Sequence, residues 1–150
     1  MAMFDTSGLD ELIANMRRMG EYSGAVADAM ILAGAEEVRK AWAKTAEDRR
    51  LRKTGQMIKS IGYSRDIKDI GGIKYTDIYP QGKDSFGRKK PVRNATKAFI
   101  LHYGSGTWKS AASGRSIGWV DQANEAAEQP VQQRLERMWD DFLKTGRVPS

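Results

Sequence analysis

The sequence predicts an α+β fold, in which a small antiparallel sheet packs against a long central helix and a C-terminal helix. Two observations favour this class. Long segments towards both ends have apolar residues at helical spacing, and a shorter segment between them has apolar residues at alternating positions, as in a half-buried β-hairpin. We expect the sheet to consist of this hairpin and further short strands. At 150 residues, the chain is expected to form a single domain.

The first third of the chain is expected to form two helices separated at Gly20. An N-cap among residues 5–7 would begin the first, because Asp, Thr and Ser side chains accept hydrogen bonds from free backbone N–H groups. Its apolar stripe consists of Leu9, Leu12, Ile13, Met16 and Met19. The second helix, from about Gly24 to Thr45, is rich in alanine, which favours helix formation. The charged segment 47–53 is expected to be a linker or a loose helical turn.

The most informative motif covers residues 53–61, with the sequence Lys-Thr-Gly-Gln-Met-Ile-Lys-Ser-Ile. Thr54 is the expected N-cap of a short helix in this segment. Met57, Ile58 and Ile61 would then lie on one face of that helix. The motif is therefore expected to begin a small folding unit.

A β-hairpin is expected directly after this motif. The parity of Ile61, Tyr63 and Ile67 predicts its first strand, half-buried on one face. Residues 68–72 contain two consecutive glycines and are expected to form the turn. The alternation resumes in a second strand with Ile73, Tyr75 and Tyr79.

Two flexible loops are expected, at about residues 80–97 and 104–118, because both segments contain many turn-forming residues. The apolar run 98–103 lies between them. Periodicity does not distinguish a buried strand from a helix over so short a run, so both alternatives stay open.

The last helix is expected to follow Trp119, with Asp121 as the candidate N-cap and Gly146 at its end. Pro130 is expected to kink or restart it, because proline lacks a backbone donor and clashes with the preceding turn. Trp42 is expected in the core, and so is Trp139 of the last helix. The apolar stripe of that helix consists of Ala127, Val131, Leu135, Met138, Trp139 and Phe142.

No catalytic motif is convincing. The segment 104–110 is similar to a phosphate-binding loop but lacks the glycines that such a loop requires. His102 is the best candidate for a general base, but its apolar neighbours favour a packed or interfacial histidine. The chain has no cysteine, and the aspartates around the hairpin match no calcium loop. We therefore expect no enzymatic activity, no metal and no cofactor.

The sequence also indicates where the protein is made. Its first residues lack the basic and then apolar order of a signal peptide, so we expect none, and no apolar run approaches the ~20 residues that a membrane span needs. The segment Asn94-Ala95-Thr96 matches a glycosylation sequon, but we consequently expect that it is not glycosylated. Synthesis in the cytoplasm is the expectation, either as a cytoplasmic protein or as part of a particle assembled there.

The net charge of +6 suggests an acidic partner or nucleic acid. Much of the excess lies in residues 49–53 and 83–97. Basic side chains in the second stretch could neutralise phosphates, and Phe86 could stack on a base. The alternatives are a solvated loop and a loop that becomes ordered only against a partner subunit.

The candidate interface combines the two loops with the end of the apolar run. Trp108, in a polar and glycine-rich segment, either anchors an interface or folds back onto its own domain. The candidate subunit-interface residues are Phe86, Arg88, Lys89, Lys90, Arg93, His102, Tyr103, Trp108, Lys109 and Arg115.

The order of motifs along the chain resembles that of small tail-component and neck proteins of long-tailed bacteriophages. The motifs that carry the resemblance are Gly8-Leu9-Asp10-Glu11-Leu12, Lys53 to Ile61, His102-Tyr103-Gly104-Ser105-Gly106-Thr107 and Trp119-Val120-Asp121-Gln122-Ala123. The alanine-rich helix and the hairpin fall between them, as in that family, so the resemblance spans nearly the whole chain. Two features depart from it: residues 49–52 replace the family's alanine and proline, and the prolines around the start of the last helix are missing.

The resemblance implies a neck- or tail-completion-like domain with a structural, non-catalytic role in a phage or prophage virion. Such proteins form rings, often hexameric, at the head–tail joint or the tail end, as connector, tail-completion or tail-terminator proteins. The implied partners are further copies of the chain, connector or stopper proteins and tail-tube proteins, with non-specific contact to passing DNA and none to a membrane. The implied location is the virion, assembled in the host cytoplasm. The alternative function is a small basic DNA-binding protein.

Overall fold

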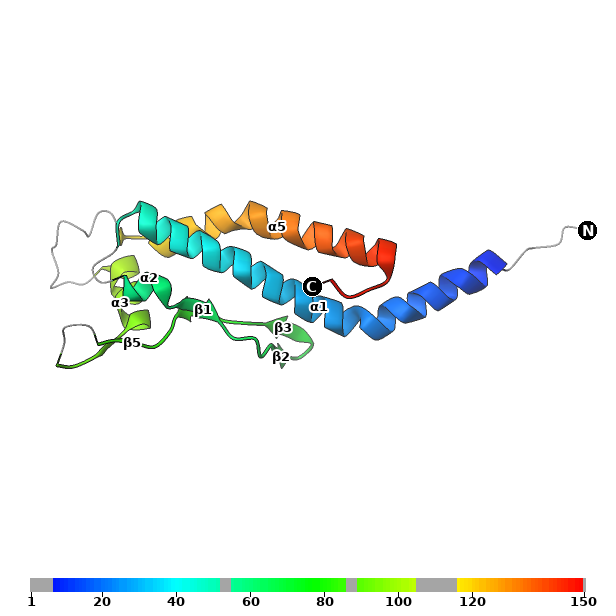
Figure 1. Ribbon diagram of the computed structural model, residues 1–150, viewed down its shortest axis with the longest axis horizontal. Coiled ribbons are helices and arrows are strands. Elements are labelled where there is room, and N and C mark those ends of the chain that lie inside the picture. Colours follow the sequence, from blue (N-terminus) through cyan, green and yellow to red (C-terminus); the bar gives the residue numbers. More distant parts are fainter. Residues whose placement is uncertain (1–6, 52–54, 86–88, 105–115, 150) are drawn as a thin grey trace, which may run out of the picture.

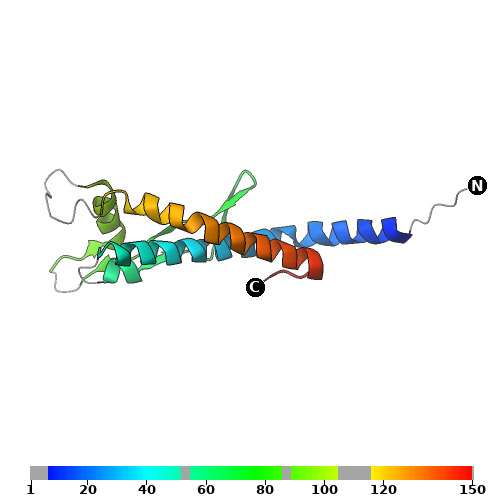
Figure 2. The same cartoon turned by 90° about the horizontal axis from the view of Figure 1, so that it is seen from above.

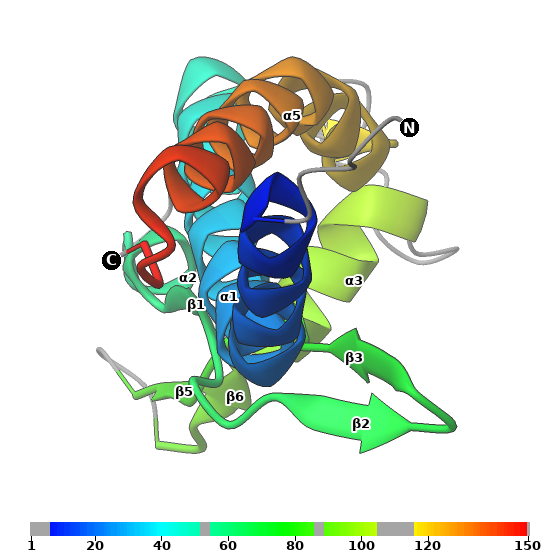
Figure 3. The ribbon, with the colours of Figure 1, turned by 90° about the vertical axis from the view of Figure 1, so that its right-hand side faces the viewer.

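Two long helices form the body of the molecule in the computed structural model, which describes residues 7–51, 55–85, 89–104 and 116–149, with side chains from residue 24 onward (Figure 1). Helix α1 (Ser7–Asp48) and helix α5 (Trp119–Thr145) lie side by side and run in opposite directions (Figures 1 and 2). Seen end-on, the strands and α5 lie on opposite sides of α1 (Figure 3). The predicted α+β class is confirmed, and within these described residues the strands form three separate two-stranded ladders.

Residues 7–48 form one helix, so the predicted break at Gly20 is wrong. Helix α1 continues through Gly20 and Gly24, and its N-terminal part extends beyond the last turn of α5 (Figures 1 and 2). A glycine inside a helix costs only about 0.5–1 kcal/mol relative to alanine, which the surrounding helix-forming residues offset. A helical pattern interrupted by one glycine therefore need not end there.

The charged segment after Thr45 closes the end of α1. The chain turns at Arg50, which has a φ of 56°, and the N–H of Leu51 donates to the carbonyl of Ala46 at 2.9 Å. Leu51 is buried in the core. The part of the predicted linker that the structure describes is thus the last turn of α1 and a tight turn held in place by one leucine.

The core is centred on Trp119, the first residue of α5, which is fully buried. Its ring lies edge-on to that of Trp42, with centroids 5.5 Å apart, and its Nε1–H donates to the Ala98 carbonyl at 3.3 Å. Buried residues from five other elements or turns surround it: Ala46, Leu51, Met57, Ile58, Ile61 and Ala98. Trp42 packs against this cluster, as expected, but Trp139 is 42% exposed, so the prediction that Trp139 belongs to the core is wrong.

The short helix α2 (Gln56–Lys59) lies where the 53–61 motif predicts a helix. Its N-cap is Gly55, with a φ of 79°, so Thr54 is not the N-cap; Thr54 itself lies outside the described residues. Met57 and Ile58 are buried as expected. Ile61 is also buried, but it lies in strand β1 (Ile61–Tyr63) because α2 ends before it.

The predicted hairpin is confirmed, in two sections. Strand β1 pairs with β4 (Ile78–Pro80), and β2 (Lys68–Ile70) pairs with β3 (Ile73–Tyr75), all antiparallel. Between the sections, the Thr76 hydroxyl donates to the Ser64 carbonyl at 2.8 Å. The turn is shorter than expected, because two residues with positive φ, Gly71 (61°) and Gly72 (85°), suffice for a tight two-residue connection.

The outer section of the hairpin diverges to one side of α1 (Figures 2 and 3). Ile70 and Ile73 face each other across the ladder, next to the turn, and both are exposed. The expectation that Ile73 continues the half-buried face is therefore wrong, because this end of the hairpin has left the helix that would cover it. The same expectation is wrong for Tyr79, which is 45% exposed. Tyr79 lies opposite Gly62, and its neighbours Ile78 and Pro80, paired with Tyr63 and Ile61, are the covered residues of this strand.

The predicted loop 80–97 is partly regular structure. Strands β5 (Lys83–Asp84) and β6 (Val92–Arg93) form a short antiparallel ladder, and helix α3 (Asn94–Tyr103) follows directly. The apolar run 98–103 is therefore helical, and Gly104 ends it. Short strand pairs of this kind have no periodicity that a sequence could reveal.

Helix α5 differs from its prediction at the start. Its N-cap is Gly118, with a φ of 71°, whereas Asp121 lies in the first turn. The helix continues through Pro130 without restarting. It ends as predicted, with Gly146 at a φ of 64° donating its N–H to the Phe142 carbonyl at 2.7 Å. No helix in the described part of the chain is long and apolar enough to span a membrane.

Candidate subunit interface

Helix α3 presents an apolar face to solvent. Thr96, Phe99, Ile100 and Tyr103 are spaced at i, i+3, i+4 and i+7, so they share one side of the helix, and all four are exposed. Phe99 is 63% exposed and Tyr103 is 67% exposed, with ring centroids 4.7 Å apart. A contiguous exposed patch containing two aromatic rings is characteristic of a protein interaction site. We call Phe99, Ile100 and Tyr103 the α3 stripe.

The opposite side of α3 is tied to the rest of the molecule. At its start, Asn94 donates from its backbone N–H to Gly82 at 3.0 Å and from its side-chain amide to Gln81 at 2.8 Å. Lys97 forms an ion pair with Asp84, whose side chain is completely buried. Ala98 packs in the core beneath Trp119. The helix is thus held firmly on one side, which fixes the direction in which the stripe points.

His102 joins α3 to the start of α5. Its side chain is only 12% exposed, and its Nδ1 accepts a hydrogen bond from the Val120 backbone N–H at 3.3 Å. Its carbonyl accepts from Gly118 N–H at 3.0 Å, and its ring lies edge-on to Tyr103 at 4.5 Å. These contacts agree with the expectation of a packed histidine. Because Nδ1 accepts, Nε2 carries the proton of the neutral ring, and it lies 3.9 Å from an Asp121 carboxylate oxygen.

Basic side chains lie beside the start of α3. Lys89, Lys90 and Arg93 are exposed, and so is Lys83 on strand β5. Lys97, which the sequence places in the same basic stretch, is instead engaged with buried Asp84. In the part of this region that the structure describes, the exposed cations are therefore Lys83, Lys89, Lys90 and Arg93.

The predicted interface residues divide into three groups. Lys89, Lys90, Arg93 and Tyr103 are exposed on or beside α3, as an interface requires. His102 lies mostly inside the protein and supports Tyr103. The remaining predicted residues lie outside the described part of the chain: Phe86, Arg88, Trp108, Lys109 and Arg115.

Sequence reasoning missed Phe99 and Ile100. Their spacing from Tyr103 is visible in the sequence, but it identifies a stripe only if the run 98–103 is helical, and that alternative was left open. Other exposed apolar residues are also known only from the structure. Among the residues whose side chains the structure describes, they are Ile70 and Ile73 at the hairpin tip, Tyr79 on β4, Ile117, and Trp139, Leu143 and Val148 towards the end of the chain.

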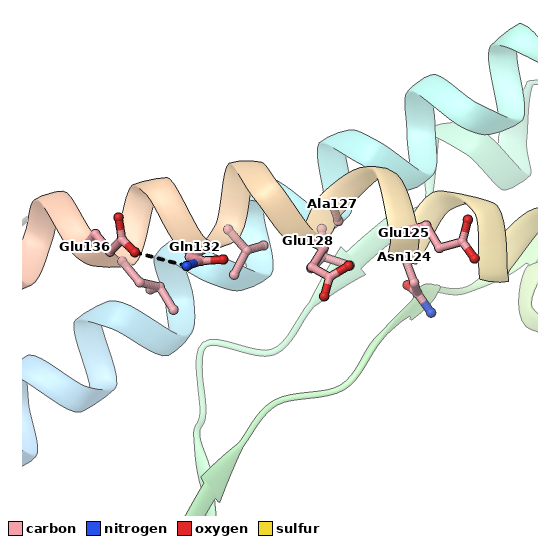
Figure 4. A pocket seen from close by; sticks show the side chains of 9 residues that line it. Asn124, Glu125, Ala127, Glu128, Gln132 and Glu136 are labelled. Atoms are coloured by element: carbon pink, nitrogen blue, oxygen red, sulfur yellow. Dashed lines mark hydrogen bonds between the residues drawn. The ribbon is translucent and has the colours of Figure 1, made fainter.

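A groove with an acidic rim lies between α1 and α5 (Figure 4). Its volume is about 700 Å³. The apolar part of its lining includes Val38 of α1 and Val131 and Leu135 of α5, which are half-buried. Three exposed glutamates of α5, Glu125, Glu128 and Glu136, line it as well, and Glu136 accepts a hydrogen bond from Gln132 at 3.1 Å. This surface combines an apolar floor with negative charge.

The described residues contain little that suggests catalysis. Within them, no group of three or more His, Asp or Glu side chains is placed to hold a metal ion. Asn94 of the sequon is 2% exposed, so a glycosyltransferase could not reach it in the folded protein.

Comparison with known proteins finds no family model, no curated protein and no solved structure that matches this chain.

Proposed function

We propose that this protein is a non-catalytic structural subunit of a phage or prophage virion, which forms a ring at the head–tail joint or at the tail end. The observation that carries the proposal is the α3 stripe. Its two exposed aromatic rings lie on a helix whose opposite side is fixed to the rest of the molecule. Such rings favour permanent contact with another protein over exposure to water.

The virion as the setting is inferred from the order of the sequence motifs. The 53–61 motif contributes α2 and the start of β1, and the 102–107 motif begins at the end of α3. The described residues of both motifs, 55–61 and 102–104, thus belong to elements around the core. The proposed partners are further copies of the chain, connector or stopper proteins and tail-tube proteins.

Assembly can be tested directly. Purified protein would be examined by size-exclusion chromatography with light scattering and by negative-stain electron microscopy, alone and with purified tails and connectors. We expect ring-shaped oligomers that bind to one end of the tail or to the connector. A protein that stays strictly monomeric and never joins tails or connectors would contradict the proposal.

A DNA-binding role is the second candidate, favoured by the exposed cations Lys83, Lys89, Lys90 and Arg93. Such binding would rest on phosphate contacts, and its affinity would fall steeply with salt, with a slope of about −0.9 per phosphate neutralised on a log–log plot. Fluorescence anisotropy with a labelled duplex and a labelled single strand over a salt series measures this slope. If neither binds at low salt, the DNA-binding candidate is excluded.

A further inference from the structure

The groove between α1 and α5 has the properties of a docking site. Its floor is apolar, with Val38, Val131 and Leu135 half-buried rather than covered, and Glu125, Glu128 and Glu136 add negative charge at its edge. A partner that fits must therefore carry an apolar centre with positive charge beside it.

The α3 stripe meets that requirement within the same chain. Phe99, Ile100 and Tyr103 supply the apolar centre, and Lys89, Lys90 and Arg93 are exposed where the chain enters α3. The α3 stripe would contact the apolar floor of the groove, and the cations would face the glutamates at its edge. Charge complementarity of this kind guides association and disfavours wrong partners.

The surface area that the aromatic rings can bury limits their share of the contact. An aromatic side chain buries about 150–250 Å² when fully covered, and about two-thirds of Phe99 and Tyr103 is still exposed. The two rings would thus bury roughly 200–330 Å², against the roughly 800 Å² that each partner contributes to a standard interface. The aromatic residues can form the centre of a contact, but the charged margin must contribute as well. Both parts therefore need a test.

We propose that the α3 stripe of one copy docks in the acid-rimmed α1–α5 groove of a second copy, with Lys89, Lys90 and Arg93 facing Glu125, Glu128 and Glu136. This contact would join the subunits of the proposed ring, so it rests on the proposed function. Stripe and groove are different surfaces of one chain, so each copy can offer its stripe to one neighbour and its groove to another. Contacts of this type close into rings when the rotation between copies permits.

The first test exchanges charges between the two surfaces. Variant A carries Lys89→Glu and Lys90→Glu, and variant B carries Glu125→Lys and Glu128→Lys. In A alone, acidic residues face acidic residues, and in B alone, basic residues face basic residues. In an equimolar mixture, both kinds of contact between A and B are complementary. Sedimentation velocity should show self-association weakened roughly tenfold or more in A and in B, and restored in the mixture.

A matched control separates this contact from general charge effects. Asp140→Lys with Asp141→Lys makes the same change in charge as variant B on the same helix, outside the residues that line the groove. It should associate like the wild type. If A and B also associate like the wild type, or if their mixture fails to recover assembly, the proposal is wrong.

The second test removes the aromatic centre. Phe99→Ser with Tyr103→Ser should weaken self-association roughly tenfold or more. The control is Ile70→Ser with Ile73→Ser, which removes exposed apolar side chains at the hairpin tip and should leave association unchanged. Thermal unfolding of each variant shows that the fold is kept, since all four side chains are exposed. Loss of association in the control but not in the α3 variant would overturn the proposal.

The outcomes also separate this contact from the virion role. Oligomers that follow the charge-exchange pattern but never bind tails or connectors would support the contact and contradict the virion function. Rings that bind to tails but ignore the charge exchange would support the function and exclude the contact.

Discussion

Replacing Gly34 with alanine tests how closely α1 and α5 pack, and it should stabilise the protein. Gly34 is buried within α1. A Cβ atom there would lie 3.6 Å from Val131 Cγ1 and 3.9 Å from Leu135 Cδ2, which is ordinary van der Waals contact. The added methyl group therefore has space and gains apolar neighbours without displacing them.

The size of the effect follows from two contributions. Alanine is favoured over glycine in a helix interior by about 0.8–1.0 kcal/mol. Burying one methyl group adds about 0.8 kcal/mol. Gly34→Ala should thus raise the free energy of unfolding by about 1.5–2 kcal/mol, which for a domain of this size corresponds to a rise in Tm of roughly 3–8 °C.

Two other glycines provide matched controls. Gly24 is exposed on the same helix, and among the described side chains a Cβ there would meet Lys74 Nζ alone, at 3.8 Å. Gly24→Ala should therefore gain the helical contribution alone, about 0.8–1.0 kcal/mol. Gly72 has open space around it but a φ of 85°, so Gly72→Ala should cost about 1 kcal/mol or more through backbone strain.

Urea unfolding of the three variants, followed by circular dichroism and tryptophan fluorescence, measures these differences. The order of stability should be Gly34→Ala, then Gly24→Ala, then the wild type, then Gly72→Ala. If Gly34→Ala is less stable than the wild type, the helices approach more closely than described and the reasoning is refuted. If it only equals Gly24→Ala, the methyl group finds no packing at the α1–α5 contact.

Two further predictions concern charged residues. Lys97→Met removes the ammonium group beside the buried Asp84 carboxylate and should lower the free energy of unfolding by about 3–5 kcal/mol. The control Lys83→Met, at an exposed position on β5, should change it by less than about 0.5 kcal/mol. Equal urea midpoints for the two variants would contradict the role of the ion pair. Hydrogen bonds from Arg39 at 2.9 and 2.6 Å hold the pKa of Glu36 below its ordinary value of 4.5, against the opposing effect of burial. Because that pKa is lowered in the folded state, the pair stabilises the protein above the ordinary pKa of 4.5, and this stability is lost progressively as the pH falls through the lowered pKa. Glu36→Gln should cost about 0.2–0.5 kcal/mol at neutral pH, and this cost should shrink as the pH is lowered below 4.5. A cost that does not change with pH would contradict the assignment.

Agreement between sequence and structure is best where a feature depends on neighbouring residues only. The hairpin forms where parity and two consecutive glycines predict it, and Gly146 ends α5 with positive φ as expected. The prediction failed at Gly20, where a local signal for a helix end was outweighed by favourable residues on both sides. It left residues 98–103 undecided because a run of this length fits both a buried strand and one side of a helix.

Predictions about the candidate interface were limited for a different reason. Tyr103, Lys89, Lys90 and Arg93 were identified from residue type and position, and they are exposed. Phe99 and Ile100 were not identified, because their exposure depends on which side of α3 faces the core. His102 was included, but contacts with Val120 and Tyr103 place most of it inside the protein.

The sequence by itself determined the α+β class, the two long helical segments, the hairpin and the position of the basic stretch, because helical period, strand parity and turn chemistry depend on residues close together in the chain. Only the tertiary structure decided that Trp119 rather than Trp139 is the buried tryptophan of α5. It also decided that Lys97 is paired with Asp84, and that an apolar stripe on α3 and an acid-rimmed groove on α1 and α5 remain exposed. Burial and pairing are set by residues distant in sequence that fold into contact, and one helix has the same period whichever of its sides is covered.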